Sequence, residues 1–316
     1  MNNNVIRVLF LGASKRVSLF ERFIHAGQLE NVKIELYSCE INDDFYPISN
    51  LATILVGPRF NDVTFSSWLI DIIFNYSIDI IIPNMDSATV VLSEILESNI
   101  LSNSYLVVSS NFLCKIMEDK ILAAEYFKSN SLPIVENDFD FYPKIIKYKK
   151  GFGSKGIYIV NSIEELQFIS DKIDIQEYLI QNFITVKETT VDMHISLTGD
   201  LIGYVLRDRL ETSDGEVMIC ETRLPNESEI LILECISKIP GWLGCITIQY
   251  FTDQHGQIFI NEINPRFGGG VTCSIEAGLD IPRNILREFL GKNIIKTGQL
   301  KNIYMTRSRR DYFYEK

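Results

Sequence analysis

The chain has 316 residues, 46% of them hydrophobic, which is long enough for two or three packed lobes. Its formal net charge of −11 argues against a nucleic-acid or anionic-membrane surface, so we expect small-molecule ligands and neither of those partners. Six cysteines without metal-ligand spacing are typical of a reducing compartment, and the N-terminal apolar run is predicted to be a strand and not a signal peptide. We therefore expect a cytoplasmic protein.

The first third of the sequence alternates between strand and helix patterns. Strands are predicted over residues 5–11, 32–38 and 78–82, with helices over 15–26 and 64–76. Alternation at this spacing predicts an α/β lobe with a parallel sheet covered on both faces. Such sheets bind ligands beyond the carboxyl ends of their strands, here at residues 12–16 and 84–87, so we expect Ser14, Arg16, Asn84 and Asp86 to line a pocket.

The rest of the chain has an α+β pattern. A helical region over 111–130 ends before Pro133, and strands over 144–148 and 156–160 flank the run KKGFGSKG. A helix to residue 172 begins at the capping box of Ser162 and Glu165, and a strand over 174–180 follows. Five further strands are predicted over 186–197, 201–208, 216–222, 243–251 and 257–263, with one helix over 227–239.

The run NEINPRFGGG, residues 261–270, carries the most informative chemistry. Side chains alternate along a strand, so Glu262 and Asn264 project together while Ile263 turns toward the interior. Gln249 lies on the strand that is predicted to pair with this one, about 5 Å away across the hairpin. Oxygen ligands suit a hard cation such as Mg²⁺, and Arg266 follows at a glycine-rich turn. A polar cross-strand pair would also explain Gln249 alone, but clustered ligands of this type rarely serve packing.

Two other features point to an anionic ligand, each with an ordinary alternative. The loop GFGSKG, residues 151–156, lets backbone amides approach a phosphate, although glycines also mark plain hairpins. Lys147 stands in an otherwise apolar strand, where an unpaired buried charge is costly, although an edge lysine could extend outward to solvent. Lys120, the strand end IQEYLI and Glu188 carry little information by themselves.

Three arginines around the loop LETSDGE form a further candidate group. Arg207 and Arg209 alternate on one strand and share a face, and with Arg223 they could clamp a carboxylate or phosphate. An ordinary charged edge explains them equally well. Three histidines without ligand spacing and the absence of a G-x-S-x-G elbow argue against a zinc site and against a nucleophilic triad.

Taken in order, EDK, IIKYKKGFGSKGI, IQEYLI, KETTVD, TIQYF and NEINPRFGGG resemble the ATP-grasp superfamily. The resemblance is to enzymes similar to the large subunit of carbamoyl-phosphate synthetase and to their stand-alone carboxylate–amine ligase relatives. It implies an N-terminal pre-ATP-grasp domain over residues 1–110 and a two-lobed ATP-grasp domain over 111–316. The small lobe would cover about 132–180, and the large, metal-binding lobe about 181–316.

The resemblance also implies an ATP site. Lys120 and Lys147 would touch the phosphates. The glycine-rich loop, with Gly153, Ser154, Lys155 and Gly156, would close over them. Glu177, Tyr178 and Leu179 would form the adenine hinge, and Glu188 would bind the ribose. Several relatives have arginine where Lys147 stands, and lysine lacks the bidentate fork, so its contact geometry stays open.

Metal and catalytic groups are implied in the same way. Gln249, Glu262 and Asn264 would hold one or two Mg²⁺ or Mn²⁺ ions. Arg266 and Lys155 would act on the transferred phosphoryl group. The substrates would be a carboxylic acid, met by Arg207, Arg209, Arg223, Ser14 and Asp86, and an amine.

The implied reaction phosphorylates the carboxylate and then lets an amine or similar nucleophile attack the acyl phosphate. A nucleotide-binding regulatory or partner protein without turnover is the chief alternative. An oxidoreductase is disfavoured because the LGASKR turn lacks G-x-G-x-x-G. The family often dimerises, so the resemblance is compatible with a homodimer, but no stretch of the sequence establishes an interface.

Overall fold

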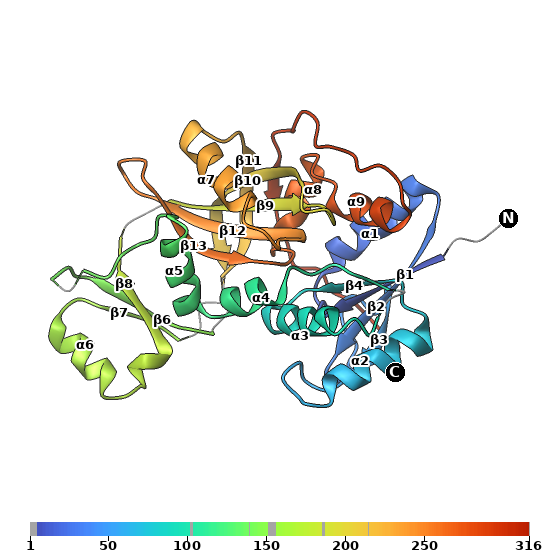
Figure 1. The fold of residues 1–316 in the computed structure, drawn as a ribbon, viewed down its shortest axis with the longest axis horizontal. Coiled ribbons are helices and arrows are strands. Elements are labelled where there is room, and N and C mark those ends of the chain that lie inside the picture. The colour runs from blue at the N-terminus through green and yellow to red at the C-terminus, as the bar shows by residue number, and fades with distance from the viewer. Residues whose placement is uncertain are drawn as a thin grey trace.

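The computed structural model describes residues 5–101, 104–138, 140–150, 156–184, 187–213 and 215–315. These residues form three β-sheets and their covering helices (Figure 1). The small sheet, in green, and the first sheet, in blue, lie at opposite ends of the long axis. Within the described ranges, every helix is too short or too polar to cross a membrane.

The first sheet is parallel, as predicted, with strand order β3-β2-β1-β4-β5. Alternate residues of β1 enter different cores: Val8 and Phe10 pack with α1, whereas Leu9 and Leu11 pack with α2 and α3. Because β1 lies between β2 and β4, the carboxyl ends of β1 and β4 meet at the point where such sheets bind ligands. The elements are β1 Val5–Leu11, α1 Val17–Glu30, β2 Lys33–Glu40, β3 Ala52–Val56, α2 Phe65–Tyr76, β4 Ile80–Pro83, α3 Asp86–Glu97 and β5 Tyr105–Leu106.

The small sheet is antiparallel with order β7-β6-β8, and two helices connect it to the first sheet. The predicted single helix over 111–130 is two helices, because Asp119 ends the first and caps the second by accepting from the Ile121 amide at 2.9 Å. The predicted strand over 174–180 begins later, since a 3-10 turn capped by Asp174 comes first. The elements are α4 Asn111–Glu118, α5 Lys120–Ser129, β6 Lys144–Tyr148, β7 Ile157–Val160, α6 Ile163–Ser170, η1 Ile175–Glu177 and β8 Tyr178–Asn182.

The large sheet is antiparallel with order β13-β12-β9-β10-β11-β14. One face packs on α4, α5 and α7 through a single hydrophobic core that includes Val191, Ile246 and Ile248. The other face carries mostly polar side chains. The elements are β9 Lys187–Ile195, β10 Leu201–Ser213, β11 Glu216–Arg223, α7 Glu227–Ser237, β12 Gly244–Thr252, β13 Ile258–Asn264 and β14 Tyr304–Thr306; the last was not predicted.

The chain ends by returning to the first sheet. Helices α8 Val271–Glu276 and α9 Ile281–Phe289 pack into the same core as Phe10 and Phe23. The ring centroids of Phe23 and Phe267 are 6.0 Å apart in an edge-to-face arrangement. Residues far beyond the predicted boundary at 110 therefore complete the hydrophobic core of the N-terminal lobe.

An ionic cluster joins α1 to the same C-terminal segment. Glu30 ends α1, its side chain is 2% exposed, and it accepts hydrogen bonds from Arg283 at 2.7 Å, Arg287 at 2.8 Å and Lys292 at 2.8 Å. Burial alone would raise the pKa of this carboxyl. The three cations outweigh burial and hold the pKa at about 2.

Because the folded-state pKa of Glu30 lies below its ordinary value, its contribution to stability is full above about pH 5 and is lost as the pH falls toward 2. We expect Glu30→Gln to lower the free energy of unfolding near pH 7 by on the order of 2 kcal/mol, allowing for solvent screening of the partly exposed cations. The difference between the two proteins, measured by urea unfolding, should shrink below pH 5. A difference that stays constant from pH 7 to the acid limit would contradict this role.

Candidate active site

A register shift between β12 and β13 determines which face of the sheet the polar side chains of NEIN, residues 261–264, occupy. Gln249 pairs with Glu262, but the next residue of β12, Tyr250, pairs with Ile260. Asn261 is therefore the extra residue of a β-bulge. In a regular strand with no bulge, Glu262 would lie on the same face as the core residue Ile260, because side chains alternate along a strand.

The bulge keeps the apolar residues of β13 in the core on both of its sides: Ile258, Ile260 and Ile263. Glu262 and Asn264 consequently face the polar side of the sheet, and the Asn264 amide donates to Glu262 Oε1 at 3.0 Å. Gln249 shares that face, since its neighbours Ile248 and Tyr250 belong to the core. The structure thus brings the three predicted metal-ligating residues together on one face, as the sequence predicts.

Lys147 reaches this face from the small sheet. It is 8% exposed on β6, and its Nζ donates to Asn261 Oδ1 at 2.9 Å and to Gln181 Oε1 at 3.2 Å. Burial lowers the pKa of Lys147 to about 8; Glu262 and Glu188 oppose the shift, and Lys120 adds to it. These charged groups come from four separate segments and act on one another at a single junction. Asn261 was not predicted, because strict alternation would turn it away from Glu262.

Arg266 connects this face to the first sheet. Pro265 fixes a tight turn in which the Arg266 amide donates to the Asn264 carbonyl at 2.8 Å. The guanidinium donates to Asp86 Oδ1 at 2.6 Å and Oδ2 at 3.1 Å, and to Asn264 Oδ1 at 3.4 Å. Asp86 begins α3 at the carboxyl end of β4, so the predicted pocket of the first lobe adjoins the predicted metal-ligating residues.

The glycines after Arg266 allow a turn to pack against the polar face. A Cβ on Gly268 would lie 2.7 Å from Thr247 Oγ1, and one on Gly270 would lie 2.3 Å from Arg207 Nη1. A Cβ on Gly269 would meet nothing within 4 Å. The turn is therefore tightly packed at its first and third glycines and open at its second.

The other predicted nucleotide residues surround the same junction. The Lys120 amide donates to the Lys149 carbonyl at 2.9 Å, which places the start of α5 beside the end of β6. Glu188, at the start of β9, is held by an ion pair with Arg209. Arg209 therefore positions a neighbouring acid in this structure, a role other than the predicted substrate clamp.

The predicted hinge and loop lie at the edge of the small sheet. β8 is an edge strand, with Tyr178 and Leu179 paired to β6, and the Glu177 carbonyl accepts from the Lys149 amide at 2.9 Å. Gly156 is described, and its φ of 69° requires the left-handed conformation that glycine adopts readily. The other predicted loop residues, Gly153, Ser154 and Lys155, lie outside the described residues.

Arg207 does not occupy the predicted substrate position. Its side chain is 1% exposed, and Nε donates to Asp192 Oδ2 at 2.8 Å and to Ser274 Oγ at 3.2 Å. Asp192 is 0% exposed, so the pair is fully enclosed between the sheet and α8. The burial of Arg207 contradicts its predicted contact with substrate, because Asp192 on the neighbouring strand neutralises it inside the protein.

Arg223 is corrected as well, because it lies on the opposite face of the sheet from Arg207. It pairs in register with the core residue Leu206, and its guanidinium binds Asp208 at 2.9 Å and Glu229 at 2.7 Å. This network joins β10, β11 and α7 on the side away from Glu262. Arg223 therefore serves the packing of α7.

Ser14 lies against Glu40, an acid that belongs to no sequence motif. Glu40, at the end of β2, accepts from the Ala13 amide at 3.0 Å and from Ser38 Oγ at 2.7 Å. Burial raises the pKa of Glu40, and the hydrogen bonds from Ser38, Ala13 and Ser14 partly offset this rise. Ser14 thus helps to fix the loop after β1.

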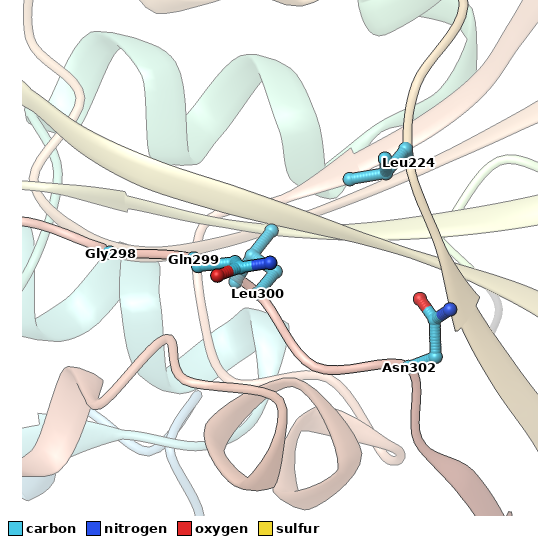
Figure 2. Close-up of a pocket in the computed structure, with 5 residues that line it drawn as sticks. All are labelled: Leu224, Gly298, Gln299, Leu300 and Asn302. Carbon is cyan, nitrogen blue, oxygen red and sulfur yellow. The ribbon is translucent and has the colours of Figure 1, made fainter.

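A pocket of about 400 Å³ opens elsewhere in the protein (Figure 2). It lies between the residue after β11 and the segment before β14, and its lining consists of Leu224, Gly298, Gln299, Leu300 and Asn302. None of these side chains is ionisable, and the pocket shares no residue with the junction of Lys147, Glu262 and Arg266. The chemistry of the site therefore lies outside this pocket.

Part of the chain is similar in sequence to known proteins. A family described as ATP-grasp in the biosynthetic pathway with Ter operon matches residues 174–309. The N5-carboxyaminoimidazole ribonucleotide synthase of Staphylococcus saprophyticus is 22% identical over 198 residues, which cover 56% of this chain and 52% of that protein. The chain therefore matches about half the length of that curated relative.

Solved structures share the fold over nearly the whole chain. The N5-carboxyaminoimidazole synthetase of Staphylococcus aureus, complexed with ADP, has a TM-score of 0.75 at 17% identity and covers 97% of this chain and 83% of its own. The biotin carboxylase domain of Hydrogenobacter thermophilus 2-oxoglutarate carboxylase, a dimer with MgADP and bicarbonate, has a TM-score of 0.72 at 15% identity, covering 93% and 71%.

The chain shares the fold of these two solved structures, and its residues 174–309 match an ATP-grasp family. The resemblance read from the sequence is confirmed at this level.

The packing of the glycine turn gives a matched pair of substitutions. Gly270→Ala should lower the free energy of unfolding by about 1–3 kcal/mol, because the enclosed Arg207 cannot move aside without losing Asp192. Gly269→Ala should change it by less than about 0.5 kcal/mol. Chemical denaturation of both variants checks this, and equal effects at the two positions would show that the turn packs differently.

Proposed function

We propose that this protein is an ATP- and Mg²⁺-dependent ligase that activates a substrate carboxylate as an acyl phosphate for attack by an amine or similar nucleophile. The observation that carries the proposal is the convergence of Lys147, Glu262, Asn264 and Arg266 on one junction between the sheets. Oxygen ligands, a buried cation and a guanidinium are the groups that phosphoryl transfer requires.

The donor set fits a hard cation. Glu262 supplies a carboxylate, and Gln249 and Asn264 supply amide oxygens on the same face; a half-turn of the Asn264 amide brings its oxygen toward Glu262. A bound Mg²⁺ would neutralise charge on the phosphates and lower the barrier to transfer. We include Gln249 because it pairs with Glu262 across the hairpin. The same oxygen donors would also accept Mn²⁺. 

The protein's own groups would then bind and orient the reactants. Lys147 and Lys120 would hold the phosphates, and Glu188, fixed by Arg209, would accept from the ribose hydroxyls. The edge strand β8 would offer backbone groups at Tyr178 and Leu179 to the adenine. The loop with Gly153, Ser154 and Lys155 would cover the phosphates, and its roles rest on the sequence alone.

The reaction would proceed in two balanced steps. A carboxylate oxygen attacks the γ-phosphorus of ATP, the bond to the β-phosphate oxygen breaks, and ADP leaves. The amine then attacks the acyl carbon, phosphate leaves, and the nitrogen loses a proton. Arg266 would offset the charge that develops on the transferred group, because its guanidinium is already oriented by Asp86. A homodimer is proposed from the likeness to a dimeric biotin carboxylase domain.

Removing the carboxylate of the metal set tests the proposal. Glu262→Ala should reduce ATP turnover by about 10²-fold or more while the unfolding midpoint stays near that of the unmodified protein. Glu221→Ala, an exposed glutamate on β11 of the same sheet, is the matched control. Turnover is measured as ADP release in a screen of paired acids and amines. A nucleotide-binding protein without ligase activity would bind ADP but release none above background under any pair.

The lowered pKa of Lys147 gives a second test. A lysine whose pKa lies at about 8 loses its charge, and its attraction for phosphate, as the pH rises through that value. The Kd of MgADP should therefore increase between about pH 7 and pH 9.5, whereas Lys147→Arg should keep a nearly constant Kd because its guanidinium stays protonated. Calorimetric titration across this range checks the difference, and parallel pH profiles would rule out a phosphate contact by Lys147.

A further inference from the structure

Three guanidinium groups surround the glycine turn after β13. Arg16 Nη2 donates to the carbonyl of residue 268 at 2.6 Å, and Arg307 Nη2 donates to that of residue 269 at 2.6 Å. Arg266 Nη1 contacts the carbonyl of residue 267 at 3.5 Å. The three arginines follow β1, β13 and β14, so the fold brings one arginine from near the start of the chain to two from its last fifth.

The positive charge of this arginine cluster, Arg16, Arg266 and Arg307, exceeds the negative charge of the acids paired with it. Arg266 is paired with Asp86, but the carboxylate next to Arg307 is Glu216, 3.6 Å away with a side chain 70% exposed. Across the part of the chain that the structure describes, Arg16 forms no salt bridge within 4.0 Å. Asp192 lies near Arg16 but is committed to the enclosed Arg207.

The electrostatics of the cluster favour a bound anion. Burial lowers the pKa of Arg16 to about 10, and repulsion from Arg266 and Arg307 contributes further. Arg16 and Arg307 each give one of five guanidinium donors to a carbonyl of the turn, so most of their donors remain for another partner. Arg266 is more fully engaged, because it also donates to Asp86 and Asn264. Holding a turn in place would need only neutral donors, whereas gathered guanidinium groups match carboxylate or phosphate oxygens.

The cluster also adjoins the proposed reaction centre and has open space. Arg266 contacts both the Asn264 amide and the turn, so a ligand on the cluster lies beside the proposed metal ligands. The second glycine of the turn faces empty space. Carbonyls two residues apart are separated by at most about 7–8 Å, which a short acid can bridge.

We propose that the arginine cluster binds an acid substrate that carries a second anionic group, either another carboxylate or a phosphate. Arg266 meets the carboxylate that is activated, and Arg16 and Arg307 meet the second anion. This inference rests on the proposed ligase function and deepens it by naming the substrate class. A monocarboxylate leaves two guanidinium groups unpaired, so the site discriminates against it by about 10-fold to 10²-fold.

Binding of small acids to the full chain tests the inference without requiring turnover. The probes are malonate, succinate and glutarate as diacids, 3-phosphonopropionate as a phosphonate, and butyrate as the monoacid. Calorimetry is run with saturating MgADP, which occupies the proposed nucleotide site, and again without nucleotide. We expect at least one dianion to bind about 10-fold or more tightly than butyrate. If a diacid binds most tightly, the second anionic group is a carboxylate; if the phosphonate binds most tightly, it is a phosphate.

Charge-removing variants locate the binding. Arg16→Gln and Arg307→Gln should each weaken binding of the preferred dianion by about 10-fold and leave butyrate unchanged. Arg309→Gln, an exposed arginine on the same C-terminal tail, should change neither. Arg16→Lys and Arg307→Lys keep the charge and should retain part of the affinity. Unfolding midpoints of all variants separate loss of binding from loss of fold.

The outcomes are distinct from those of the ligase test. Equal affinity for dianions and butyrate, loss of dianion binding in Arg309→Gln alone, or no dianion binding at millimolar concentration overturns the inference. ATP turnover with monoacids that is unaffected by Arg16→Gln overturns it while the ligase function stands. Selective dianion binding without any nucleotide binding leaves the anion site in place and removes the ligase proposal.

Discussion

One extra residue in β13 is the constraint on which the candidate site depends. The bulge at Asn261 gives up part of the strand ladder, but it keeps three isoleucines in the core, and each such side chain contributes about 1.5–3 kcal/mol when fully buried. The same shift turns Glu262 and Asn264 toward Gln249 and leaves Asn261 facing Lys147. The burial of the three isoleucines and the placement of the predicted metal ligands are thus consequences of one backbone irregularity.

Contacts between charged or polar side chains tie the three sheets to one another at this place. Arg266 and Asp86 join the large sheet to the first, and Lys147 and Asn261 join it to the small one. A ligand bound at this junction would lie beside all three sheets. Changes at Arg266 or Lys147 are therefore expected to alter both the position of the units and the chemistry between them.

Much of this arrangement can be predicted from the sequence, and the failures have physical causes. Parallel strands, the hairpin of β12 and β13, and the grouping of Glu262 with Asn264 follow from periodicity alone. Asn261 was missed although the spacing of Ile258, Ile260 and Ile263 changes from two to three, which is the signal of a bulge. The burial of Arg207 depends on Asp192, and the place of Arg307 depends on how the C-terminal tail returns to the sheet; pairings across the fold leave no local pattern.

The return of α8 and α9 to the first lobe has a consequence for biosynthesis. The N-terminal strands emerge from the ribosome early, yet Phe10 and Phe23 acquire their partner Phe267 only when most of the chain has been made. Contacts of such long sequence separation slow folding and leave apolar surface uncovered in the nascent chain. The nascent N-terminal lobe is therefore expected to bind chaperones until the residues of α8 and α9 have been synthesised and can cover its core.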